Sequence, residues 1–183
     1  IVPMQIRVLR HIRKRYGCPG GQHAPVSAPV PAQVLPKSNA NNDLLAMLLT
    51  AKYVDGLPLA RVEYVLGRSE AIVPRQTLAR WVIGTAQALQ PVFNLLRDTL
   101  LESTVIHMDE MPEQVLKEAG RTAQSQSEVI YSLIEMAWVN GLEPYTWLRR
   151  ALRCLPEARM VEQFEALLPW KVHAIDLATD SLG

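Results

Sequence analysis

The sequence is poor in the residues that build disulfide frameworks and membrane spans. It has two cysteines in 183 residues, Cys18 and Cys154, and they lie far apart in the chain. This excludes a disulfide framework and indicates a reducing compartment. No apolar run reaches the ~18 residues of a membrane span. These absences predict a cytoplasmic protein with no membrane partner. Because the first residue is Ile1 and no signal-peptide pattern follows, we expect the chain to begin inside a longer reading frame.

Acidic residues are absent from positions 1–42. Residues 1–82 carry eleven Lys/Arg against four Asp/Glu, a net charge of +7, whereas residues 83–183 carry a net charge of −6. The net charge of +1 for the whole chain conceals this asymmetry. A basic first half indicates a polyanion partner, although a solvated basic tail would have the same composition. The 49% hydrophobic content is typical of a helix-rich globular protein.

Residues 5–15, QIRVLRHIRKR, concentrate this positive charge. A strand with one basic face and a short basic helix both fit the pattern, because its period alone does not separate them. Five cations in nine residues can contact a phosphate backbone and position a protein on it without reading bases. The predicted phosphate contacts are Arg7, Arg10, Arg13, Lys14 and Arg15.

Cys18 lies in a glycine- and proline-rich turn and is the candidate zinc ligand. A C-x-x-C pair would need a second cysteine at Gly21, and only His23 and His11 are other nearby ligands. A zinc site needs about four ligands, so the pattern favours an idle thiol over bound zinc. The proline-rich residues 24–42 predict an extended linker that does not pack, ending in side chains suited to an N-cap.

Residues 43–85 have the pattern of three helices. The first spans 43–53, the second starts at Pro58 and is closed by Gly67, and the third starts at Pro74. The third has an apolar face and a polar face, as a recognition helix in a helix-turn-helix requires. Arg and Gln side chains can contact guanine and adenine edges. A plain three-helix bundle has the same pattern, but the basic arm in front favours DNA binding. The predicted DNA-contacting residues are Arg75, Gln76, Thr77 and Arg80.

The rest of the chain is helical apart from one short stretch. Residues 86–102 continue as helix, with Pro91 as a kink or a restart. Residues 104–108 have the composition of a strand, and Asp109 follows directly after them. Its carboxylate could hold Mg²⁺ or simply be solvated. Helices resume from residue 128 with an apolar stripe, and residues 171–183 predict a frayed tail.

Four passages resemble a bacterial transposase of the insertion-sequence sixty-six family. They are VLRHIRKRYGCPG, AKYVDGLPLARVEYVL, TLARWVIGTAQALQPV, and IYSLIEMAWVNGLEPYTWLRRALRCLPEA followed by EALLPW. The resemblance implies a DDE transposase, whose RNase H-like core binds Mg²⁺ through an acidic triad and catalyses DNA strand transfer. It implies Asp109 as the first carboxylate, the terminal inverted repeats of a transposon as the DNA partner, and association with the nucleoid.

The chain departs from the family pattern at several positions. Met111 stands where the family has Thr, and Gly21 replaces the second cysteine of the zinc finger. The second Asp and the Glu of the triad have no counterpart, so the chain resembles a member with an internal deletion. One carboxylate cannot hold two Mg²⁺ ions or align a nucleophile. We therefore predict that this chain alone performs no transposition chemistry.

These observations predict a mainly α fold in four segments. A basic arm with a zinc-finger remnant and linker spans 1–42, and helix-turn-helix helices span 43–102. A remnant strand of an RNase H-like core lies in 103–127, and a C-terminal helical segment in 128–183. Two alternatives to a catalytically incomplete DNA-binding protein remain open. One is an active subunit completed by another chain. The other is an interaction remnant whose leucine stripes at 89–100 and 129–155 form a homo-oligomer or bind an intact transposase.

Overall fold

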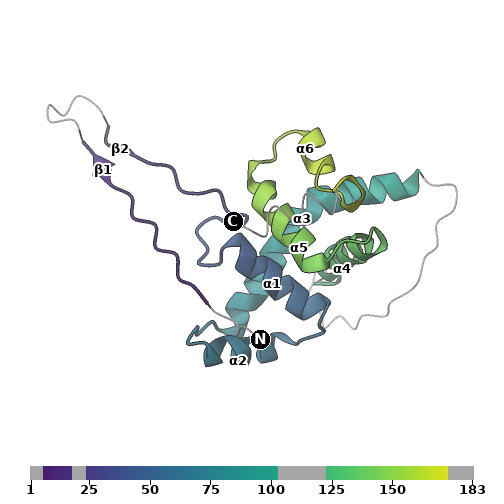
Figure 1. Cartoon of the computed structure of the whole chain (residues 1–183), viewed down its shortest axis with the longest axis horizontal. Helices are drawn as coiled ribbons and strands as arrows, with labels where there is room; N and C mark the ends of the chain where they lie inside the picture. The colour runs from purple at the N-terminus through teal and green to yellow at the C-terminus, as the bar shows by residue number, and fades with distance from the viewer. Residues whose placement is uncertain (1–5, 18–23, 103–122, 173–183) are drawn as a thin grey trace.

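The computed structural model describes residues 6–17, 24–102 and 123–172. These residues form six α-helices and one small two-stranded sheet, which confirms the mainly α prediction (Figure 1). None of the helices in these three ranges has the length and apolar content to cross a membrane. In chain order the elements are β1 (Arg15–Tyr16), β2 (Val26–Ser27), α1 (Asn42–Tyr53), α2 (Leu59–Arg68), α3 (Arg75–Leu101), α4 (Ala123–Val139), α5 (Pro144–Cys154) and α6 (Val161–Glu165), with 3₁₀ turns at Leu155–Glu157 and Pro169–Lys171.

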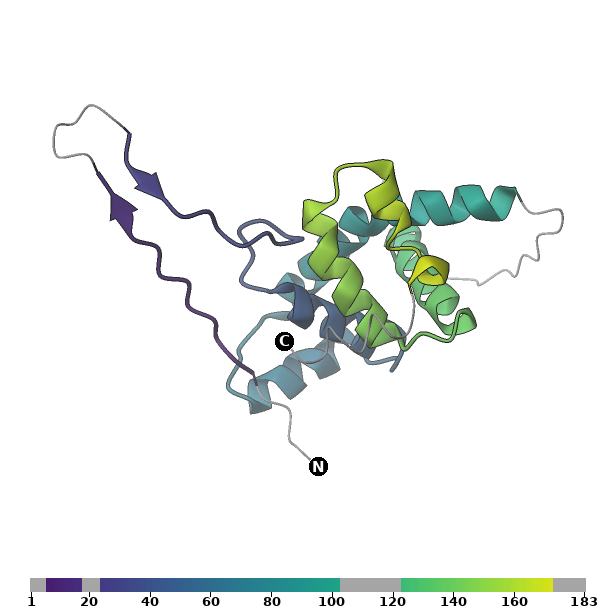
Figure 2. The same ribbon diagram turned by 45° about the horizontal axis from the view of Figure 1, so that its top comes forward.

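The basic arm is extended rather than helical. β1 and β2 pair antiparallel, with Arg15 opposite Ser27 and Tyr16 opposite Val26. The two legs of this hairpin project away from the helices, as Figures 1 and 2 show. Arg13 Nη1 donates a hydrogen bond of 3.0 Å to the Ala28 carbonyl and links the legs. The side chains from Arg7 to Tyr16 are exposed, so the arm presents its cations to solvent.

The N-terminus of α1 and the C-terminus of α2 have identifiable caps. The Asn41 side chain accepts a hydrogen bond of 2.9 Å from the Leu44 amide, as the N-cap prediction requires. The prediction that Gly67 closes the second helix is wrong, because α2 runs through Gly67 to Arg68. Instead Glu70 adopts the left-handed conformation, with φ of 63°, and the Ala71 amide bonds to the Leu66 carbonyl at 3.1 Å. This is a Schellman motif in which Glu70 takes the place usual for glycine.

α3 is a single helix of 27 residues that runs through Pro91 without a restart. Proline has no amide hydrogen, so the Gln87 carbonyl loses its usual intrahelical partner. Gln87 and Pro91 are both exposed, and solvent can bond to that carbonyl. At 1.5 Å per residue the helix is about 40 Å long. It spans the helical body from α2 at one end to beyond α6 at the other (Figure 1).

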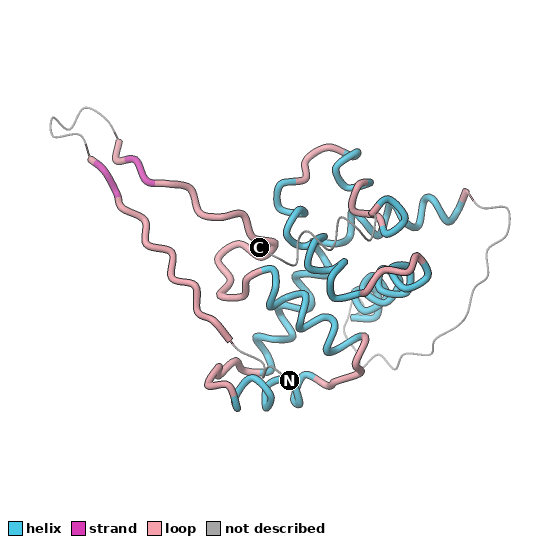
Figure 3. The backbone as a smooth tube through the Cα atoms, viewed as in Figure 1, coloured by secondary structure: helices cyan, strands magenta, loops and turns pink. Residues whose placement is uncertain are grey.

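The core forms where α3 packs on α4 and α1 packs on α5. The helical elements make up most of the described chain, and loop is concentrated in the arm (Figure 3). The predicted apolar stripe on α4 is confirmed. The helix itself starts at Ala123, earlier than expected. Its buried side chains and those of α3 pack together in the core of one chain, and the homo-oligomer stays a prediction. The buried members are Leu89, Val92, Leu96, Val129, Ile130, Leu133, Ile134 and Ala137.

The end of the predicted linker packs against the helices, which corrects the prediction that residues 24–42 do not pack. Ala40 is fully buried, and Val34 and Leu35 contact the core. The Val34 amide donates a hydrogen bond of 3.2 Å to Asn42 Oδ1. The prediction missed this because prolines and asparagines dominate the composition, whereas the few apolar residues decide the packing. The division into the segments 1–42, 43–102, 103–127 and 128–183 stays a prediction, and the expected strand at 104–108 lies outside the described residues.

Candidate nucleic-acid interface

One side of α3 is an exposed line of polar and apolar residues. Gln76, Arg80, Ile83 and Gln87 recur at intervals of three and four residues, which places them on one helix face. All four are exposed, while Leu78 and Val82 are buried on the opposite face. The first half of α3 is thus held on the protein by its apolar face, and its polar face is open to a partner.

The predicted contact residues on α3 are not equivalent. Arg80 and Gln76 lie one turn apart on the exposed line, whereas Thr77 is half-buried. Arg75 is about 140° around the helix from Arg80, because five residues separate them at about 100° each. It is exposed because it begins the helix. Ile83 and Gln87 were missed by sequence reasoning, although their spacing from Arg80 could have identified them.

α2 adds a second exposed face that the sequence prediction did not include. The Arg68 guanidinium lies over the Tyr64 ring, with its Cζ atom 5.5 Å from the ring centroid. Tyr64 is 62% exposed, and Arg61 on the preceding turn is exposed as well. The spacing of Arg61, Tyr64 and Arg68 places all three on one face of α2. This face therefore carries two cations just ahead of the turn that leads into α3.

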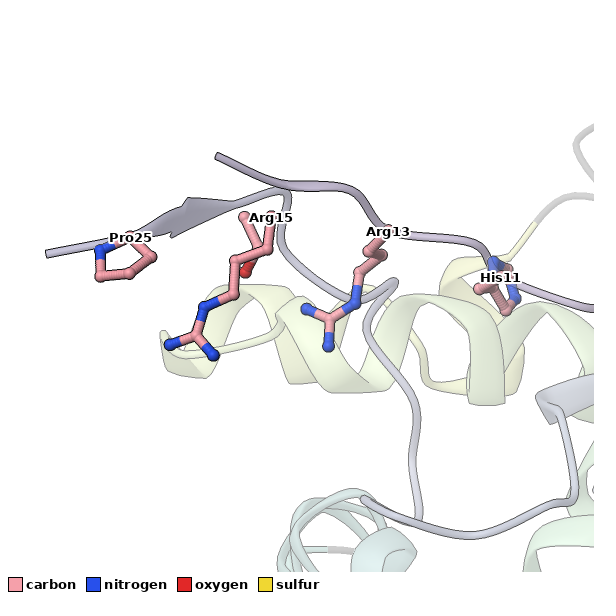
Figure 4. A pocket seen from close by; sticks show the side chains of 5 residues that line it. His11, Arg13, Arg15 and Pro25 are labelled. Atoms are coloured by element: carbon pink, nitrogen blue, oxygen red, sulfur yellow. The ribbon is translucent and has the colours of Figure 1, made fainter. Parts of the chain in front are cut away.

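The arm carries its cations on two sides. Figure 4 shows His11, Arg13 and Arg15 projecting from the same side of the extended chain, where they line an open groove with Pro25 and Ser27. Alternation along an extended chain puts Arg10 and Lys14 on the other side. Two guanidinium groups, those of Arg13 and Arg15, line the groove, so it suits a phosphate group or another anion.

The two carboxylates of the described residues with lowered pKa values lie outside these surfaces. Partial burial raises the pKa of Asp43, but hydrogen bonds from Arg153 and Arg149 lower it by a larger amount. The pKa of Asp43 therefore lies below its usual value. Partial burial also raises the pKa of Glu143, but hydrogen bonds from Thr146 and from the Tyr145 amide lower it by a larger amount. The pKa of Glu143 is therefore below its usual value as well. Asp43 joins α1 to α5 and Glu143 caps α5, so both carboxylates stabilise the fold.

The described residues do not assemble a metal site. Across 6–17, 24–102 and 123–172, no group of three or more His, Cys, Asp or Glu side chains could hold an ion. Cys18, the zinc candidate, and Asp109, the magnesium candidate, both lie outside the described residues. No catalytic step through Mg²⁺ therefore follows from the groups that are placed.

Two family models match the chain. The model described as Transposase IS66 family matches residues 37–136, and the model described as IS66 C-terminal element matches residues 132–170. Two proteins of Sinorhizobium fredii, the uncharacterized proteins y4jD and y4qI, are each 30% identical to this chain over 110 residues. The matched region covers 60% of this chain but only 22% and 20% of the two relatives. No solved structure matches the chain.

Proposed function

The chain belongs to the IS66 transposase family, and from this premise we propose that it binds transposon-end DNA through α2 and α3. Family membership gives a transposase-like function in DNA transposition. The DNA-binding role of these particular helices, and the inability of this chain to transfer strands alone, are the two parts of the proposal. Terminal inverted repeats are the DNA that such a protein has to recognise.

The exposed line on α3 carries the proposal. A recognition helix needs an apolar back that holds it on the protein and a polar front that enters the major groove. Gln76 and Arg80 provide such a front, opposite the buried Leu78 and Val82. Arg can donate two hydrogen bonds to a guanine, and Gln can bond an adenine edge in the same way. α2 precedes α3 and packs on it, as the first helix of a helix-turn-helix does.

Exposed cations on α2 and on the arm support binding to the DNA backbone. Arg61 and Arg68 lie on the exposed face of α2. The exposed arm supplies Arg7, Arg10, Arg13, Lys14 and Arg15. Phosphate contacts of this kind set the register of a protein on a duplex, and base contacts then specify the sequence.

We further propose that the chain is catalytically incomplete. The DDE transposase family uses Mg²⁺ in general, and its strand transfer needs several carboxylates around the ions. Asp109 is the single carboxylate that the family pattern identifies in this sequence. A chain with one such ligand can bind DNA but cannot position two metal ions on a scissile phosphate.

A binding titration tests the DNA-binding proposal. A duplex carrying a terminal inverted repeat is titrated at several salt concentrations with the wild-type protein, Arg80→Ala and Gln76→Ala. We expect each substitution to weaken binding about 10- to 100-fold and to relax sequence preference. The matched control is Arg97→Ala, which removes a cation near the other end of the same helix. Binding without salt dependence, or equal binding by all four proteins, would contradict the proposal.

A cleavage assay tests the catalytic proposal. The wild-type chain is incubated with the same duplex and Mg²⁺ or Mn²⁺, and no strand cleavage is expected. Cleavage that disappears in Asp109→Ala would instead support an active subunit that another copy or another chain completes.

A further inference from the structure

The second leg of the basic arm contacts α3 where the Leu35 side chain packs closely against Gly84. A Cβ atom built on Gly84 would lie 2.9 Å from Leu35 Cδ2 and 3.7 Å from Leu35 Cδ1. The first distance is shorter than ordinary carbon contacts, so any side chain at position 84 would displace Leu35. Gly84 lies inside α3, where glycine costs about 1 kcal/mol of helix stability relative to alanine. Without a Cβ at this position, the Leu35 methyl groups approach the helix backbone closely.

The chain around Leu35 is fixed at further points. The Ser38 amide donates a hydrogen bond of 3.2 Å to the Leu35 carbonyl. Ala40 is fully buried, and its amide donates a hydrogen bond of 3.1 Å to the Ser38 hydroxyl. Val34 is held by Asn42, the first residue of α1. The other leg of the arm begins at Ile6, which packs against the core. Both ends of the exposed arm are therefore secured to the helical body.

The attachment lies beside the exposed line of α3. Gly84 follows Arg80 by four residues, so the two occupy the same helix face about one turn apart. The first leg starts beside α2 in both Figure 1 and Figure 2. The arm thus leaves the body next to the surface that carries Gln76 and Arg80, and its cations begin at Arg7, directly after Ile6.

We propose that the Leu35–Gly84 contact positions the basic arm so that the arm and α3 bind one DNA duplex together. The inference rests on the proposed function, and it assigns Leu35 and Gly84 as positioning residues that touch no DNA. Two linked contact surfaces bind more tightly than either alone, because the second contact forms at a high effective concentration. That gain depends on the link holding the surfaces in a compatible geometry. An arm whose Leu35 no longer contacts Gly84 stays attached at Ile6 and Val34 and keeps all its cations, but it is held less firmly in that geometry and loses much of the gain.

Four proteins test the coupling by their affinity for a duplex of about 40 base pairs, roughly four helical turns. They are the wild type, a neutral-arm protein with the five arm cations replaced by alanine, Leu35→Ala, and the combination. We expect the neutral-arm protein to bind DNA about 100-fold more weakly than the wild type. The combined variant should bind less than about tenfold more weakly than Leu35→Ala. An equal loss in both backgrounds would overturn the inference. That result would mean that the arm binds DNA, or a second polyanion, independently of α3.

Gly84→Ala provides a second variant at the same contact. Alanine favours the helix, so this protein is expected to fold, while its Cβ displaces Leu35. The double variant Leu35→Ala with Gly84→Ala should bind DNA no more weakly than Leu35→Ala alone, because both changes break one contact. Additive losses would contradict that expectation and refute the assignment of the pair.

Hydrogen exchange without DNA separates failure of the inference from failure of the proposed function. Exchange at the Val34 and Ser38 amides should be slow in the wild type and faster in Leu35→Ala and Gly84→Ala. Slow exchange with no salt-dependent DNA binding by the wild type would refute the proposed function and, with it, the inference. Salt-dependent binding by the wild type, with exchange at these amides unchanged in both variants, would refute the inference alone.

Discussion

The Asp43 carboxylate accepts two hydrogen bonds from the Arg153 guanidinium, from Nε at 2.9 Å and from Nη2 at 2.8 Å. Asp43 lies in the first turn of α1 and Arg153 in the last turn of α5, 110 residues apart in the sequence. Arg149 Nε lies 3.2 Å from the same carboxylate. Each charge is also favourably placed for its own helix dipole, acidic at the N-terminus and basic at the C-terminus. The pair therefore joins the first helix of the body to the C-terminal segment.

Arg153→Ala is expected to lower the free energy of unfolding by about 1 kcal/mol. The two side chains are about one third exposed, so the pair is stronger than a surface ion pair but is still screened by solvent. Urea denaturation followed by circular dichroism measures the loss. Arg159→Ala, at an exposed position after α5, is the matched control and should change little.

Stability should decrease as pH falls into the range where these carboxylates titrate. The folded-state pKa values of Asp43 and Glu143 lie below the ordinary values of 3.8 and 4.5 for these carboxyl groups. In that range the unfolded chain takes up protons before the folded chain does, so protonation favours unfolding. The stabilisation is fully present at pH values above these ordinary pKa values, and it is lost as pH drops through the lower, folded-state pKa values. Urea midpoints measured from pH 7 downward should decrease less steeply in Asp43→Asn than in the wild type.

Trp147→Phe should destabilise the protein by about 3 kcal/mol. Trp147 is fully buried, and its indole Nε1 donates a hydrogen bond of 3.1 Å to the Leu167 carbonyl. The substitution leaves that buried carbonyl without its partner and creates a cavity. Trp138→Phe, at a position that is 51% exposed, should change stability by less than about 0.5 kcal/mol. Urea denaturation measures both losses, and equal urea midpoints for Trp147→Phe and Trp138→Phe would contradict the burial of Trp147.

Alanine at two glycines should have opposite effects. Gly67 is helical and a Cβ there meets no atom within 4 Å, so Gly67→Ala should stabilise the protein by up to about 1 kcal/mol. Gly141 has a φ of 73° in the turn after α4, where alanine is strained and should cost about 1 kcal/mol. Thermal melts of the two variants check the signs, and stabilisation by Gly141→Ala would rule out the left-handed turn.

Arg13→Ala and Arg80→Ala should weaken DNA binding in different ways. Arg13 belongs to the arm, so its loss should reduce affinity equally for all sequences and lower the salt slope by about one. Arg80 lies on the exposed line of α3, so its loss should reduce discrimination between the inverted repeat and a scrambled duplex. Titrations of both duplexes at several salt concentrations separate the two patterns. Identical behaviour of the two variants would contradict the division into phosphate and base contacts.

The sequence predicted the helices well where local patterns determine them. The end of the linker, Asn41 to Asp43, was expected to supply an N-cap because such side chains can bond the first free amides, and Asn41 does so. The apolar stripe from Val129 to Ala137 was predicted because apolar residues recur at helical spacing, and the structure buries it in the core. Gly67 misled the prediction, because Glu70 adopts the left-handed conformation although glycine is the usual residue there.

The sequence by itself determined where the chain forms helix, because caps and periodicity act within a few residues of each other. Tertiary structure alone decided which distant groups meet: Asp43 with Arg153, and Leu35 with Gly84. No local pattern specifies such pairs, because they depend on how whole helices pack. The arm shows the same limit. Its residues fit a strand or a helix equally well in isolation, and its extended form accompanies the pairing of β1 with β2 and the fixing of both ends on the helical body.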